Sequence, residues 1–166
     1  MKVEERRSVR TRRARSGPRQ RYALRLARGV LGAALVCAFA GAVGAAEIER
    51  TPAPEGAKVY IIAPTDGAEV TNPVTIRFGL TGMGVAPAGV DRAHTGHHHL
   101  IVDSELPPAG LPVPADENHR HFGGGQTEVT LELEPGTHTL QLLLGNHDHV
   151  PHDPPIVSER ITITVR

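Results

Sequence analysis

The sequence predicts an all-β protein, and three observations support that prediction. Short apolar runs separated by turn residues make up most of the chain after residue 58. Two of them, residues 74–80 and 126–134, alternate apolar and polar side chains, as a strand with one buried face does. No stretch of that part repeats its apolar residues with the period of a helix. We therefore expect an antiparallel β-sandwich of about six to seven strands.

The strands can be placed in order from these runs and from the turns that end them. The first, residues 59–62, ends at a turn that contains Pro64 and Gly67. Further strands are expected at residues 74–80, 97–103, 126–134, 138–144 and 161–165, with a short additional one between residues 109 and 114.

One corner of the chain refines this fold prediction. Residues 133–140, Leu-Glu-Pro-Gly-Thr-His-Thr-Leu, resemble the corner that precedes strand F of immunoglobulin-like domains. Two connections, residues 81–96 and 107–125, are long for a compact sandwich, and long loops are often functional. The expected fold is thus an immunoglobulin-like sandwich with long histidine-bearing loops, and His138 at the corner is expected to be structural.

The first 46 residues have the features of a secretory signal peptide. Residues 1–28 hold eleven Lys/Arg and two acidic residues, and small and apolar residues follow at 29–46. Glycine and alanine dominate that run, which disfavours the alternative of a membrane anchor. Residues 47–58 are then expected to form a linker and residues 59–166 the β-sandwich domain. The expected location is periplasmic or secreted, with contact to the membrane only during export.

Charge and cysteine content narrow the possible functions of the exported part. From Glu47 onward the chain has seven Lys/Arg and sixteen Asp/Glu, a net charge of −9. Nucleic-acid binding requires clustered Lys/Arg, so this charge argues against it, whereas cations would be attracted. The single cysteine, Cys37, lies in the expected signal peptide, so the domain has no thiol. No nucleophile stands in a recognisable setting, so an enzyme is less expected than a binding protein.

The histidines carry the main functional signal. All ten lie between His94 and His152, and nine fall into clusters at residues 94–99, 119–121 and 147–152. Each cluster contains a His-x-His pair, and alternate residues of an extended strand point to the same face. The pairs that would present two imidazoles side by side are His97/His99, His119/His121 and His147/His149.

This pattern predicts a transition-metal site with those three pairs as ligands. Imidazole is a common ligand of such ions. With no cysteine and a single methionine, Met83, after residue 46, a Cu(I) site is disfavoured and Cu(II), Zn(II), Ni(II) or iron remains. Secondary candidate ligands, or residues that orient the ligands, are His94, His98, His152, Asp116 and Asp148.

Two other functions remain open at this point. Copper–zinc superoxide dismutases also carry His-x-His pairs on a β-sandwich, which makes a metalloenzyme of that chemistry one alternative. This chain lacks their motif spacing and their cysteines. The other alternative is a metal-free envelope interaction module in which the histidines form a polar network. No protein partner is indicated by the sequence.

Four segments together resemble a small family of exported bacterial proteins that is described only as a domain of unknown function. They are GVAPAG at residues 84–89, TGHHHL at 95–100, PADENHRHFGGGQTE at 114–128 and LLLGNHDHVPHDPP at 142–155. The similarity extends over residues 59–165. It implies an exported, predominantly β domain and assigns no activity.

A shared metal site makes two further demands. The fold must bring at least two of the three histidine pairs within ligand distance of one another. In addition, ligating imidazoles must be neutral, and the ordinary pKa of histidine is about 6.5, so bound metal is expected to be lost near pH ~5.

Overall fold

The computed structural model describes residue 48 and residues 50–166, so the predicted signal peptide, with Cys37, lies outside the described residues. The described part contains nine strands and no helix, which confirms the all-β prediction. Within it, accordingly, no helix has the length and apolar character needed to cross a membrane.

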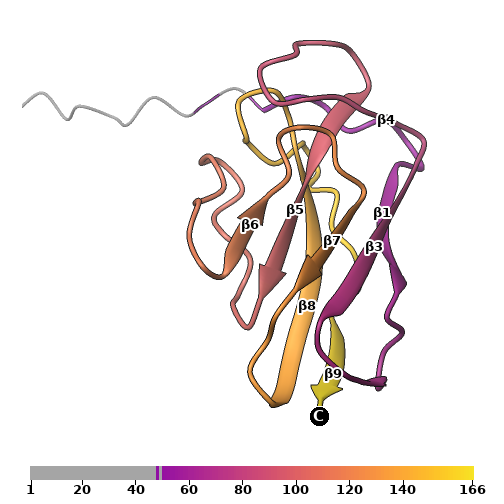
Figure 1. The fold of residues 1–166 in the computed structure, drawn as a ribbon. Coiled ribbons are helices and arrows are strands. Elements are labelled where there is room, and N and C mark those ends of the chain that lie inside the picture. Colours follow the sequence, from indigo (N-terminus) through magenta and orange to yellow (C-terminus); the bar gives the residue numbers. More distant parts are fainter. Residues whose placement is uncertain (1–47, 49) are drawn as a thin grey trace, which may run out of the picture. The chain divides into compact units, whose positions relative to one another are not determined.

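The strands form two sheets that pack as a sandwich (Figure 1). The smaller sheet has the order β1 (Lys58–Ala63), β3 (Val74–Thr81), β7 (Glu128–Leu131). The larger sheet has the order β2 (Glu69–Val70), β9 (Ile161–Val165), β8 (Gly136–Gly145), β5 (Thr95–Val102), β4 (Gly84–Val85), and β6 (His119–His121) also pairs with β5.

The pairing is mainly antiparallel, as predicted, with two short parallel pairs, β2 with β9 and β4 with β5. The strand number exceeds the expected six to seven because β2 and β4 have two residues each and β6 has three. The short strand expected between residues 109 and 114 is absent from the described chain, and that prediction is wrong. Pro112 and Pro114 have no N–H to donate to a sheet, and the N–H of Val113 donates to the carbonyl of His149.

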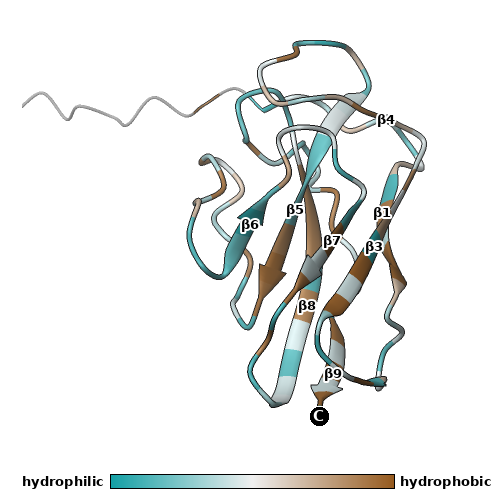
Figure 2. Cartoon of the chain, in the orientation of Figure 1, coloured by the Kyte–Doolittle hydropathy of each residue, from teal (hydrophilic) through white to brown (hydrophobic). Residues whose placement is uncertain are grey.

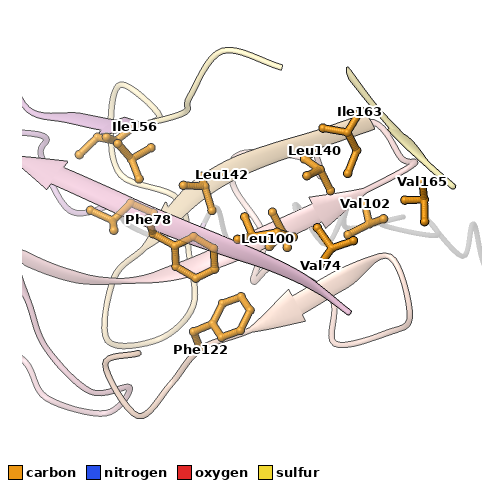
Figure 3. Close-up of a cluster of buried hydrophobic side chains, with 13 residues drawn as sticks. Val74, Phe78, Leu100, Val102, Phe122, Leu140, Leu142, Ile156, Ile163 and Val165 are labelled. Atoms are coloured by element: carbon orange, nitrogen blue, oxygen red, sulfur yellow. The ribbon is translucent and has the colours of Figure 1, made fainter. Parts of the chain in front are cut away.

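The hydrophobic core lies between the two sheets (Figure 3). Alternate residues of β5 and β8 face it, among them Leu100 and Leu142, which are both fully buried. From the other sheet Phe78 packs against Phe122, with ring centroids 4.9 Å apart. The apolar residues of the alternating pattern are therefore the ones that face the core.

Strand β5 is unusual because its side chains are buried on both faces from Gly96 to Val102. Along its length it changes from the hydrophilic His97–His99 segment to an apolar end, as Figure 2 shows. Loops cover its outer face. Val113 and Val150 from these loops are buried, and so are Ile101 of β5 and Leu143 of β8, none of which belongs to the main core. This cover places the outward-pointing histidines of β5 in a shielded environment.

The segment before β1, within the expected linker, is held against the domain. Pro52 forms a bridge with Asp153, the N–H of Asp153 donates to the carbonyl of Thr51, and the N–H of Ala53 donates to the carbonyl of Asp153. The Arg50 guanidinium donates to the carbonyls of Pro151 and His152. Residues 50–53 thus lie along the loop that carries the third histidine cluster.

Candidate metal centre

Three imidazoles converge on the outer face of the larger sheet. His97 and His99 are alternate residues of β5, and His121 is the last residue of β6. His99 and His121 lie directly opposite each other in the antiparallel pairing of these strands. One ring nitrogen from each of the three residues lies within 4.8 Å of the others. Their spacing is set by the backbone register, because the two β5 histidines and the β6 histidine belong to one hydrogen-bonded ladder.

A fourth imidazole, from His149, packs against these three. Its ring centroid is 4.6 Å from that of His121, 5.0 Å from that of His97 and 6.1 Å from that of His99. His149 lies in a turn, has a φ of 67° and donates its N–H to the carbonyl of Asn146. Its nitrogens are not among the three that converge. We call His97, His99, His121 and His149 the four-histidine group.

The spacing of the four rings matches one ion surrounded by four imidazoles. In a tetrahedral site with metal–nitrogen bonds of about 2.0–2.1 Å, ring centroids stand about 3.2 Å from the ion and about 5 Å from one another. The six centroid distances within the four-histidine group run from 4.6 to 6.1 Å. The distances between the four rings are therefore compatible with a single bound ion.

Five buried ring nitrogens at this centre have no hydrogen-bond partner among the described residues. Both nitrogens of His97, both of His99 and Nδ1 of His149 are buried and make no hydrogen bond to any described residue. Buried polar atoms are nearly always paired, and each unpaired one costs about 1–3 kcal/mol. A bound cation would satisfy one nitrogen of each of these three rings.

Burial and mutual repulsion keep these imidazoles neutral. Burial, followed by the proximity of His149 and His121, lowers the pKa of His97 to about 4. Burial, followed by the proximity of His97 and His121, lowers the pKa of His99 to about 2. The pKa of His149 is also lowered, mainly by burial. Neutral imidazole is the form that binds a metal, so His97, His99 and His149 are held in the form that could ligate one.

Two glycines make room for the rings. A Cβ at Gly123 would stand 2.3 Å from Cε1 and 2.5 Å from Nε2 of His121. A Cβ at Gly145 would stand 2.7 Å from Cε1 of His99 and 3.3 Å from Cα of His149. Gly123 belongs to the glycine run that the sequence contains just after His121. Its role here is to let the imidazole of His121 lie over the backbone.

Two other buried histidines adjoin the group without belonging to it. His98 points to the opposite face of β5, where its ring centroid is 5.2 Å from that of Phe78 in the core. His152 is fully buried, and its Nδ1 is 3.4 Å from the carbonyl oxygen of Leu144. Burial lowers the pKa of both. Neither is among the three converging histidines.

The remaining candidates lie apart from the centre. The Nδ1 atom of His119 is 2.8 Å from Oδ1 of Asp116, which also accepts from the N–H groups of Asn118 and His119. The ring of His147 turns toward carboxylates, with Nε2 3.1 Å from Asp148.

Two further histidines have other surroundings. His94 is exposed and has a φ of 57°. His138 joins Asp103 (2.6 Å) to the carbonyl of Glu134 (2.7 Å), which places it at the strand corner.

Sequence reasoning found the histidines of this centre but missed the residues that hold them. All three clusters contribute to the four-histidine group, but only the first contributes both members of its His-x-His pair. The expectation that both histidines of a His-x-His pair point to the same face does not apply to His147 and His149, because they lie in a turn and not in a strand. Asn146, which organises that turn, was not predicted. Its position directly after β8 and before the histidines is the signal that could have identified it.

Comparison with known proteins identifies a family. A family model for a domain of unknown function (DUF4399) matches residues 76–166. No curated protein and no solved structure matched the chain. The matched residues begin within β3 and include every member of the four-histidine group.

Proposed function

The chain belongs to the family of the domain of unknown function DUF4399, and we propose that it binds a divalent transition-metal ion through the four-histidine group. The observation that carries this proposal is the convergence of the nitrogens of His97, His99 and His121 within 4.8 Å. His149 is the fourth ligand in this proposal, since its ring packs against all three.

The unpaired nitrogens favour a bound ion over a metal-free polar network. A network would satisfy buried imidazoles through hydrogen bonds to neighbouring carboxylates and carbonyls. That is how His119 and His138 are held, by Asp116 and Asp103 respectively. The buried nitrogens of the four-histidine group have no such partners among the described residues.

The donor set indicates Cu(II), Zn(II) or Ni(II) as the ion. All the converging donors are imidazole nitrogens, which suit these three ions. The described chain contains no cysteine, and its one methionine, Met83, packs against the hydrophobic core. Soft sulfur ligands for Cu(I) are therefore missing from this centre.

We place this activity outside the cytoplasm, as periplasmic metal handling by an exported or secreted protein. The basic and apolar character of residues 1–46 supports export. The net charge of −9 from Glu47 onward supports a role with cations, because it adds a weak, salt-sensitive attraction for them.

Thermal unfolding with and without metal tests the proposal. Metal at about a thousand times its Kd adds about 4 kcal/mol to the free energy of unfolding, which raises the Tm by roughly 15 °C. The His121→Ala variant should lose this rise, whereas His119→Ala should keep it. Glu132→Gln with Glu134→Gln, both on the surface, should also keep it.

Two results would contradict metal binding at this centre. If the Glu132→Gln/Glu134→Gln variant lost the rise in Tm and His121→Ala kept it, the diffuse negative charge of the protein would be the cause. If elemental analysis found no metal in protein isolated from the periplasm, and none of the three ions changed the Tm, a metal-free interaction module would be favoured.

One observation favours a second function, superoxide-dismutase-like chemistry. His121 is exposed although His97 and His99 are buried, so small molecules can reach one side of the centre from solvent. Measurement of superoxide turnover by copper-loaded protein, beside copper-loaded His121→Ala, tests this function. No turnover above that of free copper would exclude it and leave metal binding intact.

A further inference from the structure

Asn146 organises the turn that carries His149. Its side chain is almost completely buried, with 4% exposed. Its Oδ1 accepts hydrogen bonds from the N–H groups of Asp148 and Val150, both at 2.9 Å. Its backbone N–H donates to the carbonyl of Val150, and its carbonyl accepts from the N–H of His149. Four hydrogen bonds from one residue thus determine the path of residues 147–150.

Thr51 fixes the other end of the Asn146 amide. The Nδ2 atom of Asn146 donates to Oγ1 of Thr51 at 3.0 Å. Because Oδ1 accepts two backbone N–H bonds, the orientation of the amide is determined, and Nδ2 must face Thr51. Thr51 is itself held by the N–H of Asp153, which donates to its carbonyl. The hydroxyl of Thr51 therefore reaches the turn from a segment that is distant in sequence.

The turn needs this support because His149 adopts a left-handed backbone conformation. Its φ of 67° is unfavourable for a residue with a Cβ, so surrounding contacts must maintain it. The second contact that maintains it is the bond from the N–H of Val113 to the carbonyl of His149. Without the Asn146 amide, residues 147–150 lose two of the bonds that keep the His149 ring against His97 and His121.

From these contacts we infer that Asn146 is the positioning residue for the fourth metal ligand, and that Thr51 positions Asn146. The inference rests on the proposed function and specifies how that site is assembled. It means that residues 50–53, which precede β1 and lie before the matched family domain, contribute to metal affinity without touching the ion. Residues that orient ligands in this way change metal affinity by about 10–100-fold when they are replaced.

Two substitutions test the inference, and a third provides the matched control. Asn146→Ala removes the amide, and Thr51→Val removes only the hydroxyl acceptor. Asn72→Ala is the control, because the Asn72 side chain also bonds both the N–H and the carbonyl of one backbone residue, Leu133, on a different part of the domain. Each protein is titrated with Cu(II), and the number of nitrogen ligands is read from the electron paramagnetic resonance spectrum.

We expect four nitrogen ligands in the wild type and in Asn72→Ala. We expect three in Asn146→Ala, with a Kd about 10–100-fold higher. Thr51→Val should also lose nitrogen ligation and raise the Kd, but by less than Asn146→Ala does. Thr51→Ser keeps the hydroxyl acceptor and should give the wild-type spectrum. Thr51→Val decides the question if Asn146→Ala does not fold. A loss of nitrogen count is a readout that simple destabilisation would not produce.

Three outcomes would overturn the inference, and they are separable from failure of the proposed function. Unchanged spectra and Kd in both Asn146→Ala and Thr51→Val would show that the turn needs no such support. Equal changes in Asn72→Ala would show a general effect of lost stability. Three nitrogens in the wild type would mean that there is no fourth ligand for Asn146 to position, although metal is bound. If the wild type bound no Cu(II), Zn(II) or Ni(II), the proposed function itself would fail.

Discussion

His99 and His121 face each other across the β5–β6 pairing, with ring centroids 5.2 Å apart and ring planes inclined by 30°. Backbone hydrogen bonds on both sides of this pair fix its geometry, from the N–H of Phe122 to His98 and from the N–H of Val102 to Asn118. The two rings are thus placed by main-chain atoms. A centre arranged in this way would need little reorganisation to bind the proposed ion, which would favour affinity.

Replacing Gly123 with alanine should weaken metal binding without unfolding the domain. The new Cβ would overlap the far end of the His121 ring, which is exposed and free to move away. The ring would then leave its position beside His97 and His99. We expect the Kd for Zn(II), measured by competition with a chelating dye, to rise about 10-fold or more. Gly110→Ala is the control, because a Cβ there meets nothing within 4 Å. Equal affinities of the two variants would contradict this role of Gly123.

The metal-free protein should lose stability in acid. The pKa values of His97 and His99 in the folded state, about 4 and about 2, lie below the ordinary value of 6.5. Below pH 6.5 the unfolded chain therefore binds more protons than the folded one, and the free energy of unfolding falls as the pH falls toward those values. Each group contributes up to about 1.4 kcal/mol per pH unit.

Urea denaturation of the metal-free protein at pH 7, 6 and 5 measures this loss. His99→Gln is neutral at every pH, so its free energy of unfolding should fall less steeply than that of the wild type. Parallel pH profiles for the two proteins would mean that His99 is protonated as easily in the folded state as in the unfolded chain.

His138 should have the opposite pH dependence. Burial acts to lower its pKa, but the hydrogen bonds to the Asp103 carboxylate and the Glu134 carbonyl outweigh that effect, so the pKa lies above its ordinary value. The protonated ring therefore stabilises the fold below pH 6.5, and this contribution is lost as the pH rises through the raised pKa.

Asp103→Asn tests the contribution of His138. Asparagine keeps an oxygen that can accept from the N–H of Thr139, and it tolerates the positive φ of 52° at this position. The variant should be less stable than the wild type by about 0.5–1 kcal/mol at pH 6, since Asp103 is partly exposed. The difference should shrink at pH 9. A difference that stays constant or grows with pH would assign the stabilisation to something other than the charged pair.

The sequence predicts the sheets better than it predicts the metal centre, and the reason is periodicity. Alternation of side chains located β3 and β7, and it placed His97 and His99 on one face of β5. The same rule cannot say which loop covers that face, because the turn at His149 depends on hydrogen bonds from Asn146 and Thr51. His119 shows a related limit. It lies on β6 two residues before His121, as the His-x-His pattern predicts, yet its ring bonds to Asp116, an aspartate three residues earlier.

Metal binding should persist to a lower pH than the ordinary histidine pKa suggests. That value, about 6.5, led us to expect loss of metal near pH ~5. In the folded protein, however, the pKa values of His97 and His99 are about 4 and about 2, so both rings stay unprotonated at pH 5. Protons then compete little for these two nitrogens, and the rise in Tm with Zn(II) should remain at pH 5 and fade toward pH 4.

Proton release gives the sharper test of the same idea. Four imidazoles with ordinary pKa values would together release about three protons on binding a metal ion at pH 6. Because His97 and His99 are already unprotonated, we expect a clearly smaller release. Calorimetry of Zn(II) binding in buffers of different ionisation enthalpy measures the number. A release near three, together with loss of binding between pH 6.5 and 5.5, would show that burial does not keep these imidazoles neutral.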